Sequence, residues 1–318
     1  MNTLSRRRLL ELGGKVAITG SMLSVLSPCA TSSAHTAPVH GTKRFQVGTY
    51  LKLRRYRSSA GGVVQSGGYL GDAWFQDLGL LPIDVVYSSR FVDGNGPTAT
   101  LNAEKLRAIA REANAVIPVS LDAEVWDKNR FGPHTPTPNG KSIVQNLVEV
   151  VRTFKQANPA VRVGLYSEVP QSTYGFNDST ASAYDKLNPQ YAAVAAVVDY
   201  YSPELYNRGY DGTQEGDQLW LRAAQYAVHA CKQLDGINRT EKPVLPYLSP
   251  GWTDRGRNPR YLSYEQMHFR LAALERLGAS GCILWLSSGA KEPGSDESLI
   301  LDPNSGWMKA AVEFARSN

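Results

Sequence analysis

The sequence predicts an α/β fold, a distorted (β/α) barrel of the TIM type with seven or eight parallel strands. Short apolar runs alternate with amphipathic helical stretches, and this alternation repeats seven times along the chain. Alternation of this kind is typical of a parallel sheet, and seven repeats in one domain favour a closed barrel. No glycine-rich phosphate-binding turn follows the first run, which argues against a doubly wound sheet.

Seven apolar runs are the expected strands. They span residues 45–50, 83–89, 115–124, 161–168, 197–206, 242–249 and 281–288. Four stretches with apolar residues three or four apart are expected helices, at 102–114, 141–158, 217–234 and 263–279. Ser263 and Gln266 match a capping box at the start of the last of these helices. The segments 57–68 and 131–140 are expected to be long loops on the face where barrel enzymes carry their active sites.

The N-terminal residues resemble an export signal. Arg6, Arg7 and Arg8 precede the apolar run 16–26, which is far shorter than the roughly 20 residues that span a bilayer. Paired arginines before such a run are typical of the twin-arginine type, with cleavage expected after Ala34. A lipoprotein attached at Cys29 is the alternative, although Pro28 departs from the usual lipobox. We therefore expect a signal peptide at 1–34, a short linker at 35–44, one catalytic domain at 45–318, and a periplasmic or secreted protein with no other membrane contact.

The composition excludes several classes of partner and cofactor. The net charge of the chain is +5, but four basic residues and one acidic residue lie in the leader, so the remainder is close to neutral. The charge therefore gives no argument for nucleic acid. No CxxC, HxH or HExxH occurs, so we expect neither a metal nor an organic cofactor. Cys231 and Cys282 remain after leader removal, and the sequence leaves open whether they pair.

Two carboxylates end the third expected strand. Side chains alternate along a strand, so Val119 and Leu121 share a face that packs under helices, while Asp122 and Glu124 point into the barrel. By the same alternation Tyr166 and Glu168 on the fourth strand, Tyr206 at the end of the fifth, and Trp285 and Ser287 on the seventh point inward. Carboxylic acids beside aromatic rings are typical of a site that binds and cleaves sugars. The alternative is a structural salt bridge beside aromatic core residues, but the location at the catalytic face favours catalysis.

These residues also resemble a known family. The segment SLDAEVWDKNR is similar to the catalytic strand of glycoside hydrolase family 56, the hyaluronidases, where an acidic D-x-E is followed by a tryptophan. VDYYSPELY, KPVLPYLS and GCILWLSSG resemble other strands of that family, whose barrel is distorted and seven-stranded. The resemblance implies that Glu124 is the proton donor and that Asp122 orients a 2-acetamido group, which acts as the internal nucleophile. It further implies that Tyr206 assists the acetamido group and that Trp285 forms a wall of the pocket, with Trp252 standing where the family has a second tyrosine. We expect Tyr166, Tyr247, Trp252 and Glu204 to complete the substrate site.

The sequence thus predicts an exported glycoside hydrolase that cleaves a polysaccharide containing N-acetylhexosamine. Glu124 must be protonated to act as an acid, and an ionised Asp122 nearby would raise its pKa toward the working pH. A muramidase-like or other endo-glycosidase, using Asp122, Glu168 or Glu204 as base or nucleophile, is one alternative. A non-catalytic carbohydrate-binding barrel is the other.

A run of cations after the first strand bears on the substrate's charge. It consists of Lys52, Arg54, Arg55 and Arg57. A solvated charged loop is one interpretation. Because loops after barrel strands line the active face, the run also predicts an anionic glycan as partner.

Overall fold

Parallel strands form at the apolar runs of the sequence in the computed structural model of the chain. The structure describes residues 44–126, 131–171, 177–253 and 259–317, all within the unit Lys43–Asn318. The leader at 1–34, Cys29 and the linker up to residue 43 lie outside the described residues. Export by the twin-arginine route and the lipoprotein alternative therefore stay predictions.

Seven extended segments form the inner wall. They are β1 (Gln46–Leu51), β4 (Leu81–Pro82) with β5 (Asp84–Tyr87), β8 (Val119–Asp122), β9 (Val163–Leu165), residues 201–204, β10 (Tyr247–Leu248) and β13 (Gly281–Leu286). β4 and β5 are separated only by Ile83 and continue one another. Each of the seven expected ranges overlaps one of these segments, so the positions of the strands were predicted correctly.

The strand pairings run round a closed circle. Two parallel sheets have the orders β10-β13-β1-β4 and β5-β8-β9, and they share the strand that β4 and β5 form. Single parallel bridges then connect β9 to β10 through residues 201–204: Tyr166 with Ser202, Tyr201 with Val244, and Glu204 with Tyr247. In the described part of the chain the wall is therefore a seven-membered parallel barrel. Its fifth strand is held by single bridges instead of a continuous ladder, so the barrel is irregular at this strand.

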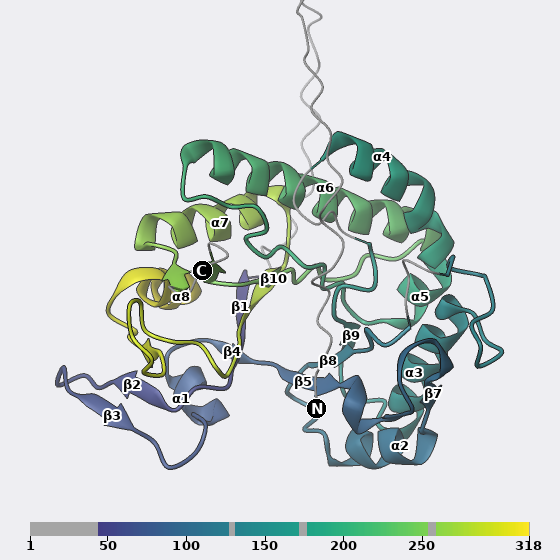
Figure 1. Ribbon diagram of the computed structural model, residues 1–318, viewed down its shortest axis with the longest axis horizontal. Helices are drawn as coiled ribbons and strands as arrows, with labels where there is room; N and C mark the ends of the chain where they lie inside the picture. The colour runs from purple at the N-terminus through teal and green to yellow at the C-terminus, as the bar shows by residue number, and fades with distance from the viewer. Residues whose placement is uncertain (1–43, 127–130, 172–176, 254–258, 318) are drawn as a thin grey trace, which may run out of the picture. The chain divides into compact units, whose positions relative to one another are not determined.

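Helices cover the outside of this barrel (Figure 1). They are α1 (Asp72–Asp77), α2 (Ala103–Glu112), α3 (Ile143–Ala157), α4 (Asp178–Leu187), α5 (Ala192–Val197), α6 (Gln214–Asn238), α7 (Tyr264–Leu277) and α8 (Gly306–Ser317). Three turns of 3-10 helix lie at Ser88–Arg90, Gly96–Thr98 and Asn188–Tyr191. The helices α2, α3, α5, α6, α7 and α8 contact one another in chain order, and α8 also packs on β1. At least one helix thus follows every strand of the barrel.

Local sequence signals set where the long helices begin. Ser263 accepts a hydrogen bond from the Gln266 backbone N–H at 3.2 Å, and the Gln266 side chain accepts one from the Ser263 N–H at 2.9 Å. The capping box predicted for α7 is therefore confirmed. Ser142 and Gln145 form the same motif before α3. Such caps satisfy N–H groups that the first turn of a helix leaves unpaired, and each is worth about 1 kcal/mol.

Alternation along the strands produces two apolar layers. Val119, Leu121 and Ala123 of the third strand face outward and join the core between strands and helices, as predicted. The barrel interior holds a second cluster. Its buried members are Ile83, Val85, Tyr200, Leu245, Tyr247 and Ile283. Gly164 makes room there, because a Cβ at this position would lie 2.4 Å from the Tyr200 ring.

Three small sheets stand apart from the barrel wall. β2 (Arg55–Arg57) pairs antiparallel with β3 (Val63–Gln65) and parallel with β14 (Ile300–Leu301). The other two are the antiparallel pairs β6 (Val92–Asp93) with β7 (Thr100–Leu101), and β11 (Gly251–Thr253) with β12 (Pro259–Tyr261). The prediction of a long loop at 57–68 is therefore wrong, because most of this segment belongs to the hairpin of β2 and β3.

Candidate active site

The carboxyl ends of the strands bring polar and aromatic residues together at one end of the barrel. Strand register makes Tyr50 the Cα partner of Trp285, Tyr87 that of Asp122, and Glu204 that of Tyr247. Because the strands are parallel, these ends meet on the face where barrel enzymes bind their substrates. We use the name mouth cluster for one set of residues at these ends. It consists of Tyr50, Tyr87, Asp122, Glu124, Tyr166, Tyr206, Tyr247 and Trp285.

The two predicted catalytic acids lie within this cluster. Asp122 is the last residue of β8, and the chain turns directly after it, with the Val125 N–H donating to the Ala123 carbonyl. The Glu124 backbone N–H lies 3.4 Å from Asp122 Oδ1. Both side chains are half-buried. Asp122 and Glu124 thus stand on one turn at the inner end of the third strand.

The charges of Asp122 and Glu124 raise the pKa values of neighbouring tyrosines. Burial raises the pKa of the Tyr87 phenol, and the charge of Asp122 raises it further. Burial also raises the pKa of Tyr247, to which Asp122 contributes as well. The pKa of Tyr166 is raised by burial first, and by Tyr206, Glu204 and Glu124 in addition. The charge of Asp122 therefore acts on the tyrosines of the second and sixth strands, and that of Glu124 acts on the tyrosine of the fourth.

Aromatic rings make a continuous lining beside the acids. Tyr206 and Trp285 are stacked, with ring centroids 5.5 Å apart and planes inclined by 20°. Tyr166 lies 6.2 Å from Tyr206, and Tyr247 meets Tyr166 edge-on at 4.8 Å. On the other side, the Trp285 indole donates to the Tyr87 hydroxyl at 3.3 Å. The predicted residues Tyr166, Tyr206, Tyr247 and Trp285 are thus brought together.

Tyr50 and Tyr87 belong to this lining but were not predicted. Tyr50 contacts Tyr87 with ring centroids 6.3 Å apart, and Lys52 lies over the Tyr50 ring at 4.7 Å. Both tyrosines stand at the ends of expected strands, 45–50 and 83–89. The alternation that selected Tyr166 and Trp285 would have selected them as well, so a usable signal was present in the sequence.

Glu204 holds other residues of the site in place. Its side chain is only 6% exposed, and both carboxylate oxygens are engaged. Oε2 accepts a hydrogen bond from the Tyr166 hydroxyl at 3.0 Å, while Oε1 lies 2.9 Å from Arg208 Nε. Arg208 also lies over the Tyr206 ring. Glu204 was predicted to bind substrate, whereas its contacts are those of a residue that orients Tyr166.

Glu168 follows a break in the fourth strand. Ser167 adopts a left-handed backbone conformation, with φ of 54°, and this interrupts the regular strand. Glu168 is 2% exposed, and after burial its charge raises the pKa of Tyr191, a residue of the core between strands and helices. That the Glu168 carboxylate points into the barrel stays a prediction.

Trp252 lies on β11, beyond the end of the sixth strand. It packs edge-on against Tyr210 at 5.2 Å, and Arg260 lies over its ring at the same distance. Within the described residues it has no ring contact with the mouth cluster. Tyr247 is fully buried, which makes it part of the floor.

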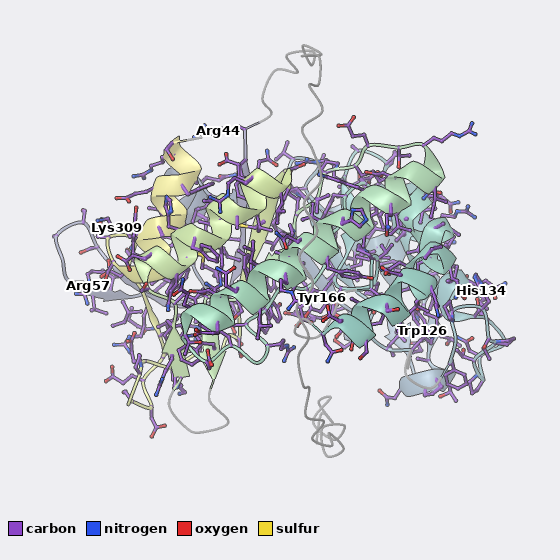
Figure 2. The ribbon with its side chains drawn as sticks, turned by 90° about the horizontal axis from the view of Figure 1, so that it is seen from above. Arg44, Arg57, Trp126, His134, Tyr166 and Lys309 are labelled. Carbon is purple, nitrogen blue, oxygen red and sulfur yellow. The ribbon has the colours of Figure 1, made fainter. Side chains whose placement is uncertain are left out.

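The basic run after the first strand is largely paired. Arg55 forms an ion pair with Glu297 at 2.9 Å, and Arg57 forms one with Asp302 at 2.8 Å. Arg54 lies over the ring of the exposed Tyr69. Figure 2 shows Arg57 and the exposed His134 at opposite sides of the view, with Tyr166 between them. Of the four cations in the run, only Lys52 contacts the mouth cluster, so the run as a whole does not support an anionic substrate.

The described residues outside the mouth cluster include two cysteines. Cys231 and Cys282 are both buried and free, and burial raises the pKa of each thiol. No group of three His, Cys, Asp or Glu residues among those described is arranged to hold a metal ion. Within the same residues, no helix has the length and apolar character that a membrane span requires.

Comparison with known proteins identifies the fold. No family model matches the chain, and no curated protein matches it. Among solved structures, bee venom hyaluronidase superposes with a TM-score of 0.53 and 15% identity, over 86% of this chain and 96% of that one. The same enzyme with a hyaluronic acid tetramer aligns at a TM-score of 0.40 and 18% identity, over 77% of this chain and 79% of that one. The spore cortex-lytic enzyme of Bacillus megaterium aligns at a TM-score of 0.40 and 9% identity, over 83% of this chain and 76% of that one.

The chain has the fold of a TIM-type barrel. The superposition on the bee venom enzyme spans nearly the whole of that structure, which agrees with the closed ring of strands. At this level of identity the likeness is one of fold, and what the site does has to be argued from its own residues.

Proposed function

We propose that the chain is a glycoside hydrolase that cleaves a polysaccharide containing N-acetylhexosamine. The observation that carries this proposal is the pairing of Asp122 and Glu124 with the stacked rings of Tyr206 and Trp285 at one end of the barrel. Cleavage of a glycosidic bond needs a carboxylic acid beside the leaving oxygen. Aromatic faces supply the flat apolar surface on which sugar rings stack.

Glu124 is proposed as the general acid. It would donate a proton to the glycosidic oxygen as the bond from that oxygen to the anomeric carbon breaks. In the second half of the reaction its carboxylate would accept a proton from the water that attacks the anomeric carbon, and the bond from that carbon to the acetamido oxygen would break. The charge of Glu124 acts on Tyr166, whose ring packs against the apolar cluster inside the barrel, and this supports the role.

Asp122 is proposed to orient the 2-acetamido group of the substrate. The carbonyl oxygen of that group would form a bond to the anomeric carbon while the leaving group departs, so no bond between enzyme and sugar is made. Asp122 would stabilise the positive charge that develops on the acetamido nitrogen. This role comes from the resemblance of the segment 120–130 to family 56, and the electrostatic effect of Asp122 on Tyr87 and Tyr247 is compatible with a place at the mouth.

A panel of polymers tests the proposal. The purified protein is incubated with hyaluronan, chondroitin, chitin, peptidoglycan and neutral glycans without amino sugars, and new reducing ends are measured. We expect cleavage of at least one polymer that contains N-acetylhexosamine, with no covalent sugar adduct on Asp122 in mass spectra.

Three outcomes would contradict parts of the proposal. Cleavage confined to glycans without amino sugars would overturn the substrate class. A trapped adduct on Asp122 would replace substrate assistance by a covalent mechanism. Binding of a glycan without any cleavage would make the chain a carbohydrate-binding barrel.

A further inference from the structure

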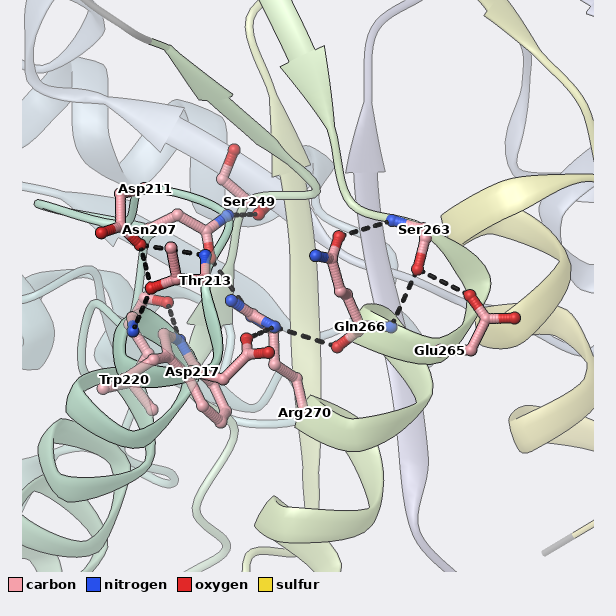
Figure 3. Close-up of polar contacts among 12 residues, drawn as sticks. Asn207, Asp211, Thr213, Asp217, Trp220, Ser249, Ser263, Glu265, Gln266 and Arg270 are labelled. Carbon is pink, nitrogen blue, oxygen red and sulfur yellow. Dashed lines mark hydrogen bonds and ion pairs between the residues drawn. The ribbon is translucent and has the colours of Figure 1, made fainter.

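Helix α7 carries a buried arginine that lies outside the mouth cluster. Arg270 is 1% exposed, and its guanidinium carbon lies 4.6 Å from the ring centroid of Tyr210 and 5.0 Å from that of Trp220. Nη1 donates to Asp217 Oδ1 at 2.9 Å and to the Gln266 carbonyl at 3.0 Å. A cation in this position is expensive to bury unless its partners are fixed. Figure 3 shows how these partners converge on Arg270.

Asn207 connects this arginine to two segments that follow barrel strands. Arg270 Nε donates to Asn207 Oδ1 at 3.2 Å. The Asn207 amide in turn donates to the Ser249 carbonyl at 2.6 Å and to the Gly251 carbonyl at 3.2 Å. Asn207 belongs to the segment 205–213 after the fifth strand, and its two acceptors belong to the segment 249–253 after the sixth. A series of hydrogen bonds from Arg270 through the Asn207 side chain therefore connects both segments to α7.

Trp220, which packs against Arg270, also forms a hydrogen bond to the segment 205–213. The Trp220 indole donates to the Leu205 carbonyl at 2.9 Å, while its ring covers one face of the guanidinium. Leu205 directly precedes Tyr206, whose ring stacks on Trp285 in the mouth cluster. The backbone on both sides of Tyr206 is thus fixed by contacts that lead to Arg270.

We propose that Arg270 is a positioning residue for the active site. It does not touch the mouth cluster, but through Asn207 and Trp220 it sets the position of Tyr206 and of the segment that carries Arg208. This inference rests on the proposed function for its effect on catalysis. A lysine cannot replace the arginine, because it lacks the planar group that donates in several fixed directions while stacking between two rings. Small displacements of a group that orients the substrate can cost about a hundredfold in rate.

Four variants separate positioning from general stability. Arg270→Lys and Asn207→Ala break the connection at either end. Arg276→Lys is the matched control on the same helix, where Arg276 is exposed. Leu274→Ala removes a fully buried side chain of the same helix and lowers stability without touching Asn207.

Hydrogen exchange and kinetics of the folded variants are then compared. For Arg270→Lys and Asn207→Ala we expect faster amide exchange in 205–213 and 249–253, and a kcat reduced about 10- to 100-fold on the cleaved glycan at a temperature where all variants are folded. Leu274→Ala should show slightly faster exchange throughout and a kcat close to that of the parent protein. Arg276→Lys should match the parent in both measurements.

Two results would overturn the inference. One is unchanged exchange in both segments of the Asn207→Ala variant. The other is a kcat for Arg270→Lys no lower than that of Leu274→Ala. The exchange measurement needs no substrate, so it still tests the anchoring of the two segments if the parent protein cleaves no glycan. A parent protein that cleaves no glycan contradicts the proposed function but leaves the anchoring of the two segments to be decided by the exchange measurement.

Discussion

The Tyr166 hydroxyl donates a hydrogen bond to the Glu204 carboxylate, which is in turn paired with Arg208. This series of contacts fixes the direction of the Tyr166 ring at the mouth of the barrel. Glu204 is buried and both of its oxygens are occupied, by Tyr166 and by Arg208. A general base or nucleophile needs an oxygen directed at the reacting atoms. Each oxygen of Glu204 already has one partner among Tyr166 and Arg208, and we therefore propose an orienting role for it.

Replacing Glu204 by glutamine distinguishes this role from direct catalysis. Glutamine keeps the shape and one acceptor oxygen, so Tyr166 can keep its partner while the pairing with Arg208 weakens. We expect Glu204→Gln to lower kcat by less than tenfold, because loss of an acid or base in the reaction itself costs about a hundredfold or more. The variant Arg208→Gln is the control and should behave similarly. A loss for Glu204→Gln as large as that for Glu124→Gln would make Glu204 a reacting group.

Residues at the strand ends differ in how far the sequence could predict them. The convergence of Tyr166, Tyr206 and Trp285 follows from regular alternation along the strands. The break in the fourth strand does not, because the left-handed conformation of Ser167 is unusual for a residue with a side chain and leaves no pattern in the sequence.

The partners of the basic run lie far along the chain. Arg55 pairs with Glu297 and Arg57 with Asp302, and such long-range contacts depend on the completed fold.

Elements were predicted best where their apolar pattern is long. Helix α3 (Ile143–Ala157) was expected at 141–158 and α7 (Tyr264–Leu277) at 263–279, because both have a regular apolar face and a capping serine. The hairpin of β2 and β3 was missed because each strand has only three residues, and glycines lie between and after them. Its strand β2 also pairs with β14, which follows more than 230 residues later in the chain. Such pairing cannot be inferred from local periodicity.

At the scale of the whole barrel, the tyrosines of the mouth cluster make the free energy of unfolding depend on pH in the alkaline range. Burial raises the pKa of each of them above the ordinary value of 10. They are Tyr50, Tyr87, Tyr166, Tyr206 and Tyr247. Above pH 10 the unfolded chain releases protons that the folded barrel retains. The stabilisation associated with these groups is therefore fully present below pH 10 and is lost as the pH rises above it.

We therefore expect the free energy of unfolding to fall as the pH rises above 10, with little tyrosinate absorbance from these rings until the protein unfolds. Chemical denaturation at a series of pH values gives the free energy, and the ultraviolet spectrum follows ionisation. The variant Tyr206→Phe removes one such group and should make the dependence shallower. Ionisation of all the tyrosines near pH 10 with no loss of stability would show that the mouth rings are solvated.

The role of Glu124 as proton donor is tested most directly by the kcat of the Glu124→Gln variant on the glycan that the parent protein cleaves. Glutamine has the same shape but cannot donate the proton, so we predict a kcat reduced at least about a hundredfold, with glycan binding and thermal stability unchanged. Glu275→Gln on the exposed surface of α7 is the matched control and should retain full activity. A kcat within a few-fold of the parent, or a loss confined to KM, would contradict the assignment of Glu124 as the general acid.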